Sequence, residues 1–124
     1  MSAEYNLYRS KIGVLVAAFP KTFNKKKPLP LKIGIHKDIN ELVDQHGLTS
    51  DEVDVCLCIW TQRREYVQQA CQVQHRFDLS GNKVCLIDYD NLRGFANRLA
   101  FMYAKLNRNF IGAMITVKKD QCNE

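Results

Sequence analysis

The sequence predicts a single α+β domain over residues 1–124 that is mostly helical and carries a small β-hairpin. Apolar residues recur every three or four positions over long stretches, which is the spacing of one helix face. A Ser-Gly-Asn turn separates two short strand-like runs. The chain has 124 residues, 46% of them hydrophobic, which suits one domain with one core. We expect about four to five helices, a core over about 5–107, and a tail over 108–124 that is frayed or partly packed.

The first part of the chain predicts two helices joined by a basic loop. Residues 4–19 place one apolar stripe on a helix face; its members are Tyr5, Tyr8, Ile12, Leu15, Val16 and Phe19. Pro20 ends this helix because proline cannot extend a helix. A loop over 20–34 contains three consecutive lysines and two prolines. A second helix is expected over 35–46, with Gly47 as its stop.

Residues 49–70 allow two interpretations. Apolar residues at 53, 55, 57 and 59 alternate with Asp54, Cys56 and Cys58, which is typical of a strand. The run Thr49-Ser50-Asp51-Glu52 is instead a capping box, in which the threonine and glutamate side chains bond each other's backbone amides. Acidic residues in the first turn also suit the helix dipole. We predict a helix that is largely buried around 53–60.

The last part of the chain predicts a hairpin and a long helix. Residues 75–79 and 83–87 flank Gly81 and Asn82, which readily adopt the positive φ of hairpin turns. Asp88 is expected to cap a final helix that reaches about residue 107. Its core stripe is Leu92, Phe95, Ala96, Leu99, Met102, Tyr103 and Leu106. Residues 110–117 are apolar enough to pack or to form a strand.

The compartment is expected to be the cytoplasm. The sequence opens without a basic start, an apolar run and a cleavage site, so we expect no signal peptide. The longest apolar run, 55–60, is too short to cross a bilayer, and no membrane partner is expected. The cysteines, odd in number, are Cys56, Cys58, Cys71, Cys85 and Cys122. We expect them to be reduced. A zinc site is the alternative, but no Cys-x-x-Cys or His-x-x-x-His pair is present, and no metal is expected.

Charge is segregated along the chain. Residues 1–37 hold eight Lys or Arg and one Glu, a net of +7, within a chain of net charge +5. Residues 38–58 hold six Asp or Glu and no Lys or Arg, a net of −6. Such segregation predicts a basic surface that faces an anionic partner, and nucleic acid is one such partner. The alternative is a solvated, lysine-rich surface without a partner.

Three ordered motifs resemble the ProQ/FinO family of RNA chaperones. The first is FPKTF at 19–23 followed by PLKIGI at 30–35. The second is WT at 60–61 followed by Tyr66, and the third is RFDLSG at 76–81. Their order and spacing are similar to those of the family, and together they cover about residues 8–104.

The resemblance implies a mostly helical α+β fold and binding to structured RNA, especially intrinsic-terminator hairpins with 3′ single-stranded tails. It implies an RNA chaperone in bacterial post-transcriptional regulation, with small RNAs and mRNA 3′ ends as partners. In relatives the positions of Lys32, Tyr66 and Arg76 line the RNA-binding surface. Relatives often carry arginines where this chain has Asp54 and Cys58, while Arg63 and Arg64 follow one to two turns later.

The chemistry of these residues suits RNA. Arg76 can bind a phosphate with two parallel hydrogen bonds, and Tyr66 can stack on a base or donate its hydroxyl. Lys32 adds charge beside a helix start, where free amides are expected. The full expected RNA-binding set is Lys25, Lys26, Lys27, Lys32, Gly34, Ile35, His36, Lys37, Arg63, Arg64, Tyr66 and Arg76. The structural alternatives are solvated lysines, a core tyrosine and an Arg76–Asp78 ion pair. Trp60 is expected in the core, and Thr61 is expected to bond its own helix.

An enzyme is not expected. The three histidines lie in different segments, and no Gly-rich phosphate loop or nucleophile elbow is present. We therefore expect no catalytic residues, no cofactor and no small-molecule substrate. The alternative function is that of a basic DNA-binding regulatory protein, although no helix-turn-helix signature is apparent. We expect a monomer.

Overall fold

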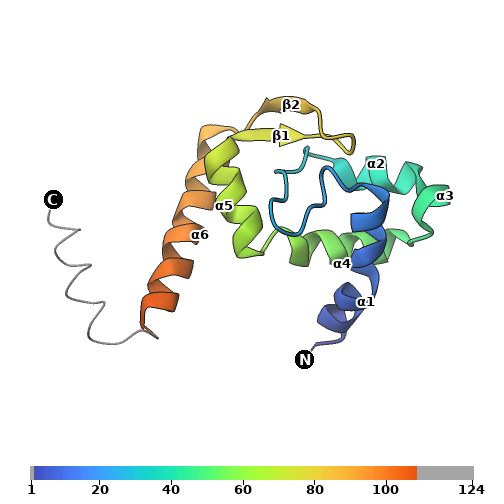
Figure 1. Cartoon of the computed structure of the whole chain (residues 1–124), viewed down its shortest axis with the longest axis horizontal. Coiled ribbons are helices and arrows are strands. Elements are labelled where there is room, and N and C mark those ends of the chain that lie inside the picture. The colour runs from blue at the N-terminus through green and yellow to red at the C-terminus, as the bar shows by residue number, and fades with distance from the viewer. Residues whose placement is uncertain (1, 109–124) are drawn as a thin grey trace, which may run out of the picture.

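The computed structural model describes residues 2–108 of the chain (Figure 1). Over that range it contains six helices and a two-stranded antiparallel sheet, so the predicted helix-rich α+β class is confirmed. In chain order the elements are α1 (Ala3–Ala18), α2 (Ile35–Glu41), α3 (Val43–His46), α4 (Ser50–Trp60), α5 (Arg64–Val73), β1 (His75–Phe77), β2 (Lys83–Leu86) and α6 (Tyr89–Arg108). The expectation for 110–117 lies outside the described residues.

Helix α1 forms as its apolar spacing predicts. The Ser2 hydroxyl caps it by accepting the Tyr5 amide at 3.1 Å, and the helix ends two residues before Pro20. Ile12 and Leu15 are buried on its inner face, which packs against α4. The main core therefore lies between α1, α4 and the loop that follows α1.

The structure has more helices than expected because two predicted helices are each divided. The helix expected over 35–46 breaks at Leu42, whose φ of −104° and ψ of 28° lie outside the helical region. Gly47 ends α3 in the left-handed conformation, as predicted. The helix expected over 49–70 begins with the predicted capping box but ends at Trp60. Arg63 is extended and begins α5 in a new direction (Figure 1).

The hairpin ties the loop before α2 to the rest of the fold. Strands β1 and β2 pair in antiparallel register, and Gly81 in the turn between them has a φ of 83°. The Phe77 amide donates to Pro30 O at 2.8 Å, and the Lys32 amide donates to Phe77 O at 2.9 Å. These bonds hold the basic loop against β1, so residues distant in sequence become neighbours.

Helix α6 packs along α5 and projects beyond it (Figure 1). Leu92, Phe95, Leu99 and Met102 are partly buried, as the predicted stripe requires. The prediction is wrong for Ala96 and Tyr103, which are exposed. The reason is that α6 has 20 residues and α5 only 10, so the shorter α5 covers only a narrow face of α6. No helix within 2–108 combines the length and the apolar character that crossing a bilayer requires.

Candidate functional site

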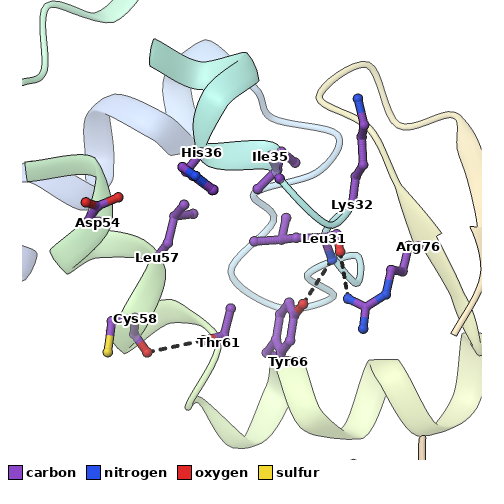
Figure 2. A pocket seen from close by; sticks show the side chains of 11 residues that line it. Leu31, Lys32, Ile35, His36, Asp54, Leu57, Cys58, Thr61, Tyr66 and Arg76 are labelled. Carbon is purple, nitrogen blue, oxygen red and sulfur yellow. Dashed lines mark hydrogen bonds between the residues drawn. The ribbon is translucent and has the colours of Figure 1, made fainter. Parts of the chain in front are cut away.

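An open pocket of about 450 Å³ lies between the loop before α2, the α4 helix, the start of α5 and strand β1 (Figure 2). We call it the Lys32–Arg76 pocket. It is lined by Leu31, Lys32, Gly34, Ile35, His36, Asp54, Leu57, Cys58, Thr61, Tyr66 and Arg76. The sequence motifs that are far apart in the chain therefore meet around one cavity.

The backbone of Leu31 organises the polar wall of this pocket. Its amide donates to the Tyr66 hydroxyl oxygen at 2.9 Å. Its carbonyl accepts from Arg76 Nη1, also at 2.9 Å, and Figure 2 shows both bonds meeting at this one residue. Since the Leu31 side chain is buried in the core, both polar side chains are fixed before any ligand arrives.

The Tyr66 hydroxyl accepts a hydrogen bond in this setting, and its ring is too buried to be a stacking surface. The residue is only 2% exposed, and its ring makes an edge contact with Phe95 at 6.0 Å between centroids. Because the hydroxyl oxygen accepts the Leu31 amide, the hydroxyl proton remains free to donate. Burial raises the pKa of Tyr66, with the Leu31 hydrogen bond, Arg76 and Arg98 acting in the opposite direction. Of the two roles expected for Tyr66, the structure favours donation.

Arg76 carries a buried positive charge at the pocket wall. The residue is 9% exposed, and it takes part in no ion pair among the side chains that the structure describes. The alternative pairing with Asp78 is not found, because the Asp78 carboxylate accepts the amides of Ser80 and Asn82 in the hairpin turn. A buried charge without a counter-charge is costly. An anionic ligand in the pocket would supply the missing counter-charge.

Lys32 lies at the rim of the pocket in a partly exposed ion pair. Its Nζ is 2.8 Å from Asp38 Oδ2, and this hydrogen bond raises the pKa of Lys32. Gly34 precedes α2 with a φ of 82°. Free amides were expected at the helix start beside Lys32, but the Ile35 amide donates to Lys32 O at 3.1 Å. The expectation is therefore wrong for Ile35.

The opposite wall of the pocket comes from α4. Asp54 and Cys58 lie one helical turn apart, are both exposed, and face the cavity with His36 and Leu57 (Figure 2). Within the described residues, no three His, Cys, Asp or Glu side chains are grouped so as to hold a metal ion.

Two further expectations on this helix are confirmed. Trp60 is fully buried. The Thr61 hydroxyl donates to Cys58 O, a carbonyl of its own helix, at 3.2 Å. Leu31 and Leu57 also line the pocket, and neither was singled out from the sequence, where nothing distinguishes them from other core leucines.

The other expected RNA-binding residues lie outside this pocket. Lys25 and Arg63 line a separate small cavity beside α1. The side chains of the rest are exposed; they are Lys26, Lys27, Lys37 and Arg64. The structure therefore divides the expected set into a pocket group, the two residues of the cavity beside α1, and a group distributed over the surface.

Comparison with known proteins agrees with the three motifs. The model of the ProQ/FinO family matches residues 8–109. A FinO-like RNA chaperone from Neisseria meningitidis MC58 superposes with a TM-score of 0.64, at 18% identity and 81% coverage of each chain. A ProQ homolog from Legionella pneumophila superposes with a TM-score of 0.57, at 20% identity, covering 82% of this chain and 84% of that one. No curated protein sequence matches this chain. At these identities the structural likeness concerns the fold.

Proposed function

The chain belongs to the ProQ/FinO family, and on that premise we propose that it is an RNA-binding protein that acts as an RNA chaperone. The observation that carries the proposal is the buried guanidinium of Arg76, which opens onto a pocket without an ion-pair partner among the described residues. Nucleic acid supplies the phosphates that such a charge requires.

The Lys32–Arg76 pocket suits the last nucleotides of an RNA 3′ tail. Arg76 would bind a phosphate oxygen, and the Tyr66 hydroxyl would donate to a phosphate or to a ribose hydroxyl. Lys32 would add positive charge at the rim. Its ion pair with Asp38 already neutralises part of that charge, so its contribution to binding would be reduced. The pocket is open, so a strand can enter it from the solvent.

The duplex part of the RNA would lie on the basic surface outside the pocket. The exposed Lys26 and Lys27 belong to a segment, 1–37, with a net charge of +7. Such contacts attract phosphates without reading base sequence. The expected ligands are therefore hairpins with a free 3′ end, as in small RNAs and the 3′ ends of mRNAs with intrinsic terminators.

Matched RNA and DNA hairpins, each with a single-stranded 3′ tail, test this function. We expect the RNA to bind more tightly, and its affinity to fall as salt is raised, because bound lysines and arginines displace counterions. Affinities are measured by equilibrium titration over a salt series. Equal or tighter binding of the DNA would favour the alternative of a DNA-binding regulatory protein, and a response that is flat with salt would reject the electrostatic part.

Removing the negative charge of Asp54 is expected to tighten RNA binding. Asp54 is exposed on the α4 wall of the pocket, where its carboxylate repels any phosphate bound by Arg76. For Asp54→Asn we expect roughly threefold to fivefold tighter binding, a charge effect of at most about 1 kcal/mol across the cavity. The matched control is Asp90→Asn, an exposed carboxylate on α6 that does not line the pocket. Equal effects of the two variants would show that only net charge matters.

A further inference from the structure

A second cavity, of about 290 Å³, lies beside α1 and is lined by several positively charged side chains. It is lined by Tyr8, Arg9, Ile12, Lys25 and Arg63. We call it the Arg9–Arg63 cavity. No carboxylate lines it, and Arg63 forms an ion pair with Glu65 outside the lining, with Oε1 3.9 Å from Arg63 Nη2. This distance makes a weak, partly exposed pair, so the positive charge is poorly balanced.

Arg63 is held rigidly in this cavity. Its Nη2 donates to the Lys25 carbonyl at 2.8 Å, and its guanidinium carbon lies 4.6 Å from the centre of the buried Trp60 ring. Its Nη1 is buried and has no hydrogen-bond partner among the described residues. The guanidinium is therefore fixed by two contacts that do not neutralise its charge, which only the weak pair with Glu65 balances, and an anion would gain from this preorganisation.

The loop that carries Lys25 is also ordered. The Asn24 side-chain oxygen accepts the amides of Lys26 and Lys27 at 2.9 and 3.0 Å. This turn presents Lys25 toward the cavity that it shares with Arg63. On the α1 side, burial raises the pKa of Tyr8, with Arg63 acting in the opposite direction. The Tyr8 hydroxyl therefore stays protonated near neutral pH, and the polar side chains that line the cavity can all donate hydrogen bonds.

Shared lining residues link this cavity to the Lys32–Arg76 pocket. An intermediate hollow is lined by Tyr5, Gln62, Cys58 and Arg63, among others. It shares Cys58 with the Lys32–Arg76 pocket and Arg63 with the Arg9–Arg63 cavity. The three hollows therefore adjoin one another around the C-terminal end of α4. An extended strand that leaves the first pocket over this surface would pass the intermediate hollow, whose lining includes Glu4, before it reaches the cation-lined cavity.

We propose that the Arg9–Arg63 cavity binds a backbone phosphate of the same RNA whose 3′ end occupies the Lys32–Arg76 pocket. The inference rests on the proposed function and adds a second anchoring point, on α1. Three cationic side chains and one hydroxyl, all donors, match the oxygens of a phosphodiester. A free phosphate ion has the same chemistry, so the test must separate the two sources.

The test compares Arg9→Gln with Arg93→Gln. Both arginines are exposed on helices, so both variants are expected to fold, and they change the net charge equally. Arg93 lines none of the three hollows. We expect Arg9→Gln to weaken binding of a tailed RNA hairpin roughly tenfold and to reduce the slope of log affinity against log salt by about 0.7–0.9, the loss of one phosphate contact. Arg93→Gln should leave both quantities close to those of the wild type.

Lys25→Gln provides an independent variant, because it removes the lysine charge and leaves the carbonyl that holds Arg63. It should weaken RNA binding and lower the salt slope as Arg9→Gln does. In a separate experiment, single backbone phosphates of the RNA are ethylated. Ethylation of the phosphate bound in the cavity should weaken binding to the wild type but not to Arg9→Gln. Equal RNA affinity and salt slope in Arg9→Gln and Arg93→Gln would overturn the inference. A second result would also overturn it: inorganic phosphate raises the melting temperature of the wild type but not of Arg9→Gln, while Arg9→Gln and Arg93→Gln bind RNA equally. The ligand of the cavity would then be the free phosphate ion. Failure of the wild type to bind RNA would instead reject the proposed function, and the inference with it.

Discussion

Removal of the 3′ single-stranded tail from an RNA hairpin is expected to weaken its binding to this chain roughly a hundredfold, the loss of about 3 kcal/mol of charged hydrogen bonds. The physical reason is the fixed pair of donors, Arg76 and the Tyr66 hydroxyl, that Leu31 holds at the pocket wall. Without a tail these donors have no phosphate or ribose to bind. The measurement is the equilibrium affinity of one hairpin with the tail intact and with the tail deleted.

The control for this prediction is the same hairpin with its stem base pairs swapped and its tail intact. A-form RNA hides its base edges in a deep, narrow groove, so a protein recognises the stem by shape and backbone. We expect the swapped stem to bind within about twofold of the original, since phosphate contacts carry no sequence information. Equal affinity with and without the tail would reject the pocket as a 3′-end site. A large loss on swapping would reveal base recognition in the stem.

Arg76→Ala is expected to weaken RNA binding by about 2–3 kcal/mol, roughly 30- to 100-fold, the range for losing hydrogen bonds between charged groups. The same change leaves the Leu31 carbonyl without its donor. We therefore also expect a lower melting temperature, by the equivalent of about 1–3 kcal/mol for an unsatisfied buried acceptor. Binding must be measured well below the melting temperature of the variant, with circular dichroism as the check on folding.

Arg76→Lys separates the loss of charge from the loss of geometry. A lysine keeps the positive charge but cannot form the two parallel bonds of a guanidinium. Its affinity should lie between those of the wild type and Arg76→Ala. If Arg76→Ala is folded and binds RNA as the wild type does, the assignment of this side chain to the RNA site is wrong.

The parts of the fold with strong local signals were predictable from the sequence. The capping box at Thr49 and Glu52, the Gly81 turn and the apolar face of α1 all depend on residues close together in the chain. The break between α4 and α5 was not predictable in this way. Residues 61–63 contain neither proline nor glycine, and the turn there is held by distant contacts, such as Arg98 Nη2 with Thr61 O at 3.3 Å.

The site was predictable only in part, for the same reason. Motif order indicated Lys32, Tyr66 and Arg76, and the structure brings all three to one pocket. The sequence could not show that Leu31 joins the last two, because these residues are 35 and 45 positions away from it. It also gave no reason to single out Arg9, whose neighbours in the cavity come from a loop and from the start of α5.

The most direct test of a 3′-end site in the Lys32–Arg76 pocket is photo-crosslinking with an RNA hairpin that carries 4-thiouridine as its 3′-terminal nucleotide. The crosslinked peptides are identified by mass spectrometry. If the 3′ end occupies this pocket, crosslinks form to peptides that contain residues 31–36, 54–61 or Tyr66, which surround it. An unlabelled tailed hairpin should compete these crosslinks away, and a tailless one should not. Crosslinks confined to α6 or to β2, with none to the pocket peptides, would contradict this placement of the 3′ end.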